Sequence, residues 1–265
     1  MSKLTINLKN MEESNIESKN VNTNSNNNYK QIAGAIIIAG FLIAGAILLK
    51  DSKSVSLNNV TPVINLAPVD KEDRILGNPE AKVALVMYED FQCPFCEVIS
   101  GLQENTPLLK ALKQRDSSWT PFIPGVINDY VKNGKVLFVY RDWAFLGPES
   151  TRAAEAARCA GDQGKFWEYH DYLYSHQKGE NEGTFSDSNL KSFAKELKLE
   201  TSSFNKCLDD SKYAEAVADS RNKGAEAGVS GTPKGFIVKK GKVVSTIDGA
   251  ESYATVKQKI ESALK

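Results

Sequence analysis

Three kinds of hydrophobic pattern follow one another along the chain. Residues 1–30 are polar and rich in Asn and Ser, with almost no apolar periodicity. Residues 32–49 then form a run of eighteen residues without a charged side chain. From about residue 74 onwards, apolar segments of strand length alternate with segments of helical period. The pattern predicts a polar tail, one hydrophobic span and one folded domain.

The first two segments point to a membrane anchor. The tail at 1–30 cannot bury enough apolar surface to fold, and we expect it to be disordered. A helix of eighteen residues is about 27 Å long, close to the thickness of a bilayer core, so a transmembrane helix is predicted at 31–50. A cleaved signal peptide is the alternative, but the preceding polar region is long and the small residues 44–46 lie inside the apolar run. An uncleaved signal anchor is favoured, followed by a linker at 51–73.

The remaining residues, 74–265, have the pattern of one α/β domain. The run at 83–88 is apolar at every position, which is typical of a central strand covered on both faces. A second such strand is expected at 136–140, and helical period then dominates to about residue 227. The chain ends in two strands and an amphipathic helix. The first helix is expected at 93–112, kinked or restarted at Thr106-Pro107. The further expected elements are helices at 149–159, 165–176, 187–197, 202–209 and 212–227, and strands at 236–238 and 243–247.

Two cysteines lie where the first predicted strand gives way to a helix. A cysteine at a helix N-terminus is close to unpaired backbone N–H groups and to the positive end of the helix dipole, which lower its pKa. Pro94 suits the first helical position, and the spacing lets Cys96 close a disulfide with Cys93. We predict a redox-active pair in which Cys93 is the exposed nucleophile and Cys96 the more buried resolving thiol.

Other uses of this Cys-x-x-Cys pair fit the sequence less well. A structural zinc site needs four ligands, usually with a second close pair of Cys or His residues. The remaining candidates are widely spaced: Cys159, Cys207, His170 and His176. Covalent haem requires His directly after the second Cys, where this chain has Glu97. An inert bridge or two buried thiols remain as alternatives. We expect neither a metal nor an organic cofactor, and we interpret the two histidines as packing within an aromatic helical segment.

Charge and cysteine content bound the partners and the compartment. The chain has 33 basic and 33 acidic residues and no basic stripe, which argues against nucleic acid as a partner. The lysines that flank the hydrophobic span are balanced and do not decide its orientation. Four cysteines suit an oxidising compartment, so the domain is predicted to lie outside the cytoplasmic membrane. There, Cys159 and Cys207 are predicted to form a structural disulfide, with two unconnected buried thiols as the alternative.

Several short segments together resemble one protein family. They are 88–96 (YEDFQCPFC), 139–142 (VYRD), 156–160 (AARCA), 164–167 (GKFW) and 228–233 (GVSGTP). These segments, and the order of the predicted elements, are similar to those of the DsbA-like thiol:disulfide oxidoreductases of the thioredoxin superfamily. The resemblance covers residues 74–265. It implies a thioredoxin fold with a helical insertion at about 148–227.

The resemblance also implies a function. Pro233 is expected to be cis and to face the disulfide, and the backbone of Thr232 to pair with an extended substrate peptide. The protein would be a single-pass, membrane-anchored enzyme that forms, reduces or isomerises disulfides in secreted or surface proteins through a mixed disulfide at Cys93, with oxidation favoured. Its partners would be cysteine-containing proteins and a membrane redox partner. A peptide-binding holdase without redox turnover is the alternative, and the presence of both cysteines argues against it.

The chain departs from the family pattern at two places. Family members often carry a carboxylate six residues before the nucleophile, where this chain has Met87. Glu89 has the same strand parity, which leaves open whether it takes over that role or is a solvent-exposed residue at the strand end. The segment 111–123 is longer than expected and is interpreted as a surface loop.

Overall fold

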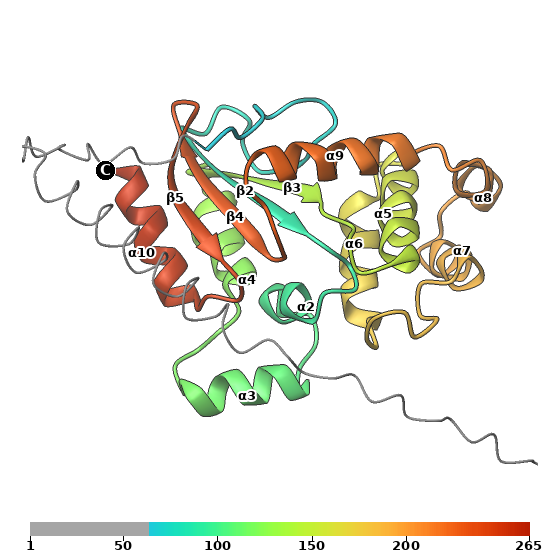
Figure 1. Cartoon of the computed structure of the whole chain (residues 1–265), viewed down its shortest axis with the longest axis horizontal. Coiled ribbons are helices and arrows are strands. Elements are labelled where there is room, and N and C mark those ends of the chain that lie inside the picture. The colour runs from blue at the N-terminus through green and yellow to red at the C-terminus, as the bar shows by residue number, and fades with distance from the viewer. Residues whose placement is uncertain (1–63) are drawn as a thin grey trace, which may run out of the picture. The chain divides into compact units, whose positions relative to one another are not determined.

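A mixed five-stranded β-sheet forms the centre of the domain in the computed structural model, which describes residues 64–265 (Figure 1). The strand order is β1-β3-β2-β4-β5, with β2 and β3 parallel and the other neighbours antiparallel. The strands are β1 (Arg74–Leu76), β2 (Val83–Glu89), β3 (Val136–Asp142), β4 (Lys234–Lys239) and β5 (Lys242–Asp248). The α/β fold expected from the sequence is confirmed.

The central strand β2 is buried on both faces, as its continuous apolar run predicts. Val83, Leu85 and Met87 pack into the larger core cluster, on the face covered by α2 (Pro94–Ser100), α4 (Phe122–Val126) and α10 (Tyr253–Leu264). Val86 and Tyr88 pack into a second cluster on the opposite face. Because side chains alternate along a strand, Glu89 lies on the same face as the larger cluster.

The segment expected to be helical at 93–112 forms two helices, and the second begins at the predicted restart, Thr106-Pro107. α2 ends at Gly101, whose φ of 69° is left-handed. α3 (Pro107–Arg115) begins after Thr106, whose side chain accepts a hydrogen bond from the N–H of Leu109 at 3.2 Å.

The segment 111–123 is not the surface loop that the sequence suggested. It completes α3 and leads into α4 and η1 (Ile127–Val131). Trp119 is buried between them, and its indole N–H donates to the carbonyl of Ala250 at 3.1 Å. The aromatic anchor therefore ties this segment to the loop before α10.

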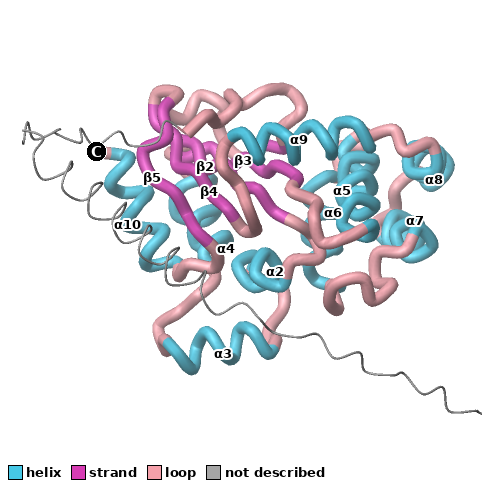
Figure 2. Tube along the Cα trace, in the orientation of Figure 1, coloured by secondary structure: helices cyan, strands magenta, loops and turns pink. Residues whose placement is uncertain are grey.

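A helical insertion separates β3 from β4, as predicted (Figure 2). Its last helix, α9, returns along the sheet face opposite α2, where Gly224 approaches the rings of Trp143 and Tyr88 so closely that an added Cβ would lie within 3 Å of both. The helices are α5 (Pro148–Gly161), α6 (Phe166–His176), α7 (Asp187–Glu196), α8 (Thr201–Asp209) and α9 (Ala214–Glu226).

The N-terminal predictions fall largely outside the structure. The tail at 1–30, the hydrophobic span at 31–50 and most of the linker at 51–73 lie outside the described residues. Among residues 64–265, no helix has both the length and the apolar character needed to cross a membrane.

Cys159 on α5 and Cys207 on α8 are joined by a disulfide with a Cα–Cα separation of 5.9 Å. The bond closes a loop of 48 residues, which limits the freedom of the unfolded chain. Replacing both cysteines by Ala is therefore expected to lower the free energy of unfolding by about 4 kcal/mol. Denaturant unfolding of the wild type and of Cys159→Ala/Cys207→Ala measures this loss. A double variant within about 1 kcal/mol of the wild type would contradict the loop-closure argument.

Candidate active site

The two redox cysteines lie at the start of α2, directly after the loop that follows β2. Cys93 is the residue before the first helical residue, and its carbonyl accepts from the N–H groups of Cys96 and Glu97 at 3.1 and 3.0 Å. Both thiols are free in this structure. Cys96 is completely buried, and Cys93 is only 4% exposed. The expectation of an exposed nucleophile was therefore wrong, although Cys93 remains the more accessible of the two.

The environment favours a thiolate at Cys93 rather than at Cys96. A hydrogen bond from the Cys96 thiol lowers the pKa of Cys93, and the backbone N–H groups of Cys96 and Phe95 act in the same direction. Burial raises the pKa of Cys96 well above its ordinary value, and its interaction with Cys93 raises it further. The pair is thus asymmetric, because a thiolate forms more readily at Cys93 than at Cys96.

The loop before β4 closes over Cys93. The Thr232–Pro233 peptide bond is cis. The carbonyl oxygen of Thr232 is 3.4 Å from the Cys93 sulfur and accepts a hydrogen bond from its thiol. Pro233 is buried and Thr232 is half-buried. The structure therefore brings together the four residues singled out from the sequence: Cys93, Cys96, Thr232 and Pro233.

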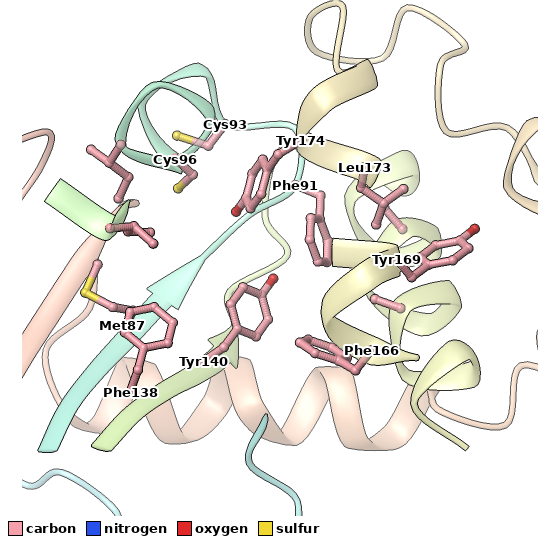
Figure 3. Packing of buried hydrophobic residues seen from close by; sticks show 14 of the residues in the cluster. Met87, Phe91, Cys93, Cys96, Phe138, Tyr140, Phe166, Tyr169, Leu173 and Tyr174 are labelled. Carbon is pink, nitrogen blue, oxygen red and sulfur yellow. The ribbon is translucent and has the colours of Figure 1, made fainter. Parts of the chain in front are cut away.

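Glu89 is a buried carboxyl group beside the thiols and not a solvent-exposed residue at the strand end. It is 1% exposed, and its Oε2 accepts from the Tyr174 hydroxyl at 3.0 Å, whereas Oε1 has no hydrogen-bond partner among the described residues. Burial raises the pKa of Glu89 to about 8. When Glu89 is ionised, its negative charge in turn raises the pKa of Cys96. Figure 3 shows the Tyr174 ring close to Cys96, whereas Met87, which is earlier in β2, lies further from the thiols.

A buried polar network, missed in the sequence, fixes the loop before Cys93. Asp90 accepts from the backbone N–H of Gln92 at 2.8 Å and from the Ser150 hydroxyl at 2.7 Å. The Gln92 side chain donates to Ser150 at 2.8 Å and accepts from the N–H of Asn181 at 2.5 Å. Gln92 and Asp90 are at most 1% exposed. Buried hydrogen-bond networks are strong when every group is paired. This network therefore fixes the position of the loop before Cys93 relative to the helical insertion.

The two histidines do not join the cysteines. His170 is buried among aromatic rings, with its ring centroid 4.9 Å from that of Tyr174 and 5.2 Å from that of Tyr140. His176 stacks on Tyr172 at 3.9 Å. Within residues 64–265, no group of three or more His, Cys, Asp or Glu residues is arranged to hold a metal ion. The packing interpretation of both histidines agrees with these contacts.

Comparisons with known proteins agree with this geometry. A family model described as "Thioredoxin" matches residues 70–110 and 118–262. The chain is 32% identical over 175 residues to the Na(+)/H(+) antiporter NhaA 1 of Salinispora arenicola, a match that covers 65% of this chain and 22% of that protein. It is 26% identical over 167 residues to the probable disulfide bond formation protein D of Bacillus cereus, covering 61% of this chain and 68% of that protein. The chain thus spans about a fifth of the length of the antiporter relative.

Solved structures give the same fold. BdbD from Bacillus subtilis, in its oxidised form, superposes with a TM-score of 0.61 and 21% identity, covering 76% of this chain and 98% of that chain. The family model leaves residues 111–117 unmatched. This gap lies at the end of α3, within the segment that the sequence had already marked as unusual.

Proposed function

Because this chain belongs to the thioredoxin family, we propose that it is a DsbA-like protein-disulfide oxidoreductase, with Cys93 and Cys96 as its reactive pair. One observation carries the proposal: the pKa of Cys93 is lowered and that of Cys96 is raised within one hydrogen-bonded pair beside the carbonyl of Thr232. An inert structural bridge does not require this asymmetry. A reactive pair does, because one sulfur must attack or leave as a thiolate.

Disulfide transfer to a substrate follows in two balanced steps. A substrate thiolate attacks the Cys93 sulfur of the oxidised pair, forming a mixed disulfide and releasing Cys96 as a thiolate. That thiolate takes a proton, for which the neutral Glu89 carboxyl is the neighbouring donor. A second substrate thiolate then attacks the substrate sulfur of the mixed disulfide, and Cys93 leaves as a thiolate. The substrate is oxidised by two electrons, and the enzyme is left as a dithiol.

The direction of transfer is proposed to be oxidation of the substrate. A stabilised Cys93 thiolate favours the reduced enzyme, which makes its disulfide a stronger oxidant. An oxidase of this kind needs a partner that removes electrons from the dithiol, and we propose a membrane redox protein for that role. Thr232 would pair through its backbone with an extended substrate peptide. A holdase that only grips peptides remains the second candidate, but no observation favours it.

The proposed location is the outer side of the cytoplasmic membrane. The hydrophobic span at 31–50 would be a single anchor after a polar tail at 1–30, and the linker at 51–73 would lead to the catalytic domain at 74–265. The disulfide between Cys159 and Cys207 supports an oxidising compartment. Cysteine-containing secreted or surface proteins would be the substrates.

The redox state of the pair in growing cells tests the direction of transfer. Acid quenching followed by alkylation is expected to find Cys93 and Cys96 mainly as a disulfide. The purified oxidised protein should also transfer one disulfide per molecule to a reduced, unfolded protein that has two cysteines. A pair found mainly as a dithiol in cells would instead indicate a reductase or an isomerase. If the protein exchanges no disulfide with any substrate, the peptide-binding holdase becomes the better candidate.

A further inference from the structure

An apolar groove lies on the sheet face opposite α2, α4 and α10. Its volume is about 1360 Å³. It is lined by residues of all five strands, by the segment 64–69 that begins the described chain and by the segment 79–82 before β2. We call it the Val244 groove. The large apolar residues that line it are Ile64, Leu66, Val69, Ile75, Val86, Leu137, Val238, Val243 and Val244.

The Val244 groove contains half of the large hydrophobic residues that are exposed in the described part of the chain. Val69, Ile75 and Val244 are 41%, 39% and 49% exposed, and they are three of the six large hydrophobic residues exposed in the described part of the chain. Single exposed apolar residues are ordinary, but a continuous apolar surface with a polar rim marks a site that binds protein or membrane.

The rim of the groove has one sign of charge. Its charged lining residues are Lys82, Lys240 and Lys242, and among residues 64–265 no acidic residue lines it. None of these lysines has an ion-pair partner in the described residues. Lys240 and Lys242 flank Gly241 at the turn between β4 and β5, so their ammonium groups belong to one corner of the groove. A ligand that complements this surface therefore has both an apolar part and a negatively charged part.

We propose that the Val244 groove docks on an anionic lipid bilayer, with its exposed apolar residues Val69, Ile75 and Val244 at the level of the acyl chains and the lysines at the phosphates. The proposal rests on the membrane anchor of the proposed function. The groove contains Ile64, the first described residue, and fourteen residues separate it from the end of the apolar run at 32–49. A chain of that length spans at most about 50 Å, so the anchor keeps this face within reach of the bilayer.

Docking in this way leaves the thiols free. Lys82 precedes β2 at the groove, whereas Cys93 follows the other end of β2, and seven strand residues correspond to about 23 Å. Figure 1 shows the turn between β4 and β5 at the opposite end of the strands from α2. A bilayer on the Val244 groove therefore holds Cys93 on the far side, facing soluble proteins.

Depth-dependent quenching tests the docking in the full-length protein. We would reconstitute Val244→Trp in nanodiscs that contain brominated phosphatidylglycerol and compare it with Leu102→Trp, a matched control. Leu102 is 38% exposed and follows α2. Bromine is expected to quench the additional Trp fluorescence of Val244→Trp and not that of Leu102→Trp. Replacing Lys82, Lys240 and Lys242 together by Gln should weaken docking roughly 100-fold.

Three results would overturn the proposal. Equal quenching of the two Trp variants, or quenching of neither, contradicts lipid docking. In the absence of lipid, the added Trp of Val244→Trp could instead be shielded from solvent in a protein that sediments as a dimer. That result assigns the groove to a second copy of the chain. Hydrogen exchange at the β5 amides, measured on the wild type with and without anionic lipid, repeats the test without a substitution.

Extraction of membranes with alkaline carbonate separates this proposal from the anchor on which it rests. Protein that stays in the membrane pellet but shows no quenching has an anchor and no docking, which refutes the groove alone. Protein released by carbonate has no anchor. Sedimentation of that released protein with phosphatidylglycerol vesicles and with phosphatidylcholine vesicles then decides the groove, because equal binding to both removes the role of the lysines.

Discussion

Replacing Cys93 by Ser is expected to abolish disulfide exchange. Cys96→Ser should still attack a substrate disulfide through Cys93 and should hold the resulting mixed disulfide, because the Cys96 thiol that would release Cys93 is missing. The reason is the asymmetry of the pair, in which the sulfur with the lowered pKa is Cys93. A serine hydroxyl cannot take part in thiol exchange at either position. Non-reducing gels of both variants, incubated with a protein whose two cysteines form a disulfide, measure the two outcomes.

The alkylation rates of the reduced wild type provide the control for this assignment. At mildly acidic pH, Cys93 should react with iodoacetamide much faster than Cys96, because alkylation requires a thiolate and Cys96 is fully buried. Equal rates for the two thiols would contradict the assignment. So would mixed disulfides that accumulate in Cys93→Ser through Cys96.

The free energy of unfolding of the wild type is expected to fall as pH rises, and Glu89→Gln should show only a small part of that fall. The pKa of Glu89 is about 8 in the folded protein and near 4.5 in the unfolded chain, because burial disfavours its charge. The folded state therefore holds a proton that the unfolded state releases between these values. Its contribution to stability is complete below pH 4.5 and is lost as pH rises to about 8, by roughly 4 to 5 kcal/mol.

Denaturant unfolding of the reduced protein from pH 5 to pH 9 measures this effect. Glu97→Gln is the matched control, because burial also raises the pKa of Glu97, to about 7, on the adjacent helix. In Glu97→Gln, the free energy of unfolding should still fall with pH because Glu89 is present. Only the smaller part of the fall, which is due to Glu97, should disappear. Parallel curves for the wild type and Glu89→Gln across this range would show that Glu89 is already ionised in the folded protein.

The sequence predicts those features that depend on neighbours along the chain. The apolar run of β2 predicts a strand buried on both faces, and the Cys93-Pro94 step predicts where α2 begins. The buried state of Glu89 is different, because it depends on Tyr174, which is 85 residues away in sequence. Strand parity alone places Glu89 on the correct face, but it does not reveal what covers that face.

Two other differences have the same origin. Cys93 was expected to be exposed, and it is buried at the loop of Thr232, 139 residues further along the chain. The contact of Gln92 with Asn181 spans 89 residues, and neither residue type signals it in advance. In both cases, packing between distant segments decides whether the group is buried. The residues near it in the sequence do not indicate this packing.

The disulfide between Cys159 and Cys207 has a consequence for the biogenesis of the enzyme. In the proposed location outside the membrane, a chain exported from its N-terminus presents Cys93, Cys96 and Cys159 before Cys207 has emerged. The two active-site cysteines are three positions apart and can pair at once, whereas Cys159 must wait for a partner 48 residues later. The second bond therefore closes later than the first, and under the proposed function an oxidised copy of the enzyme is a disulfide donor suited to closing it.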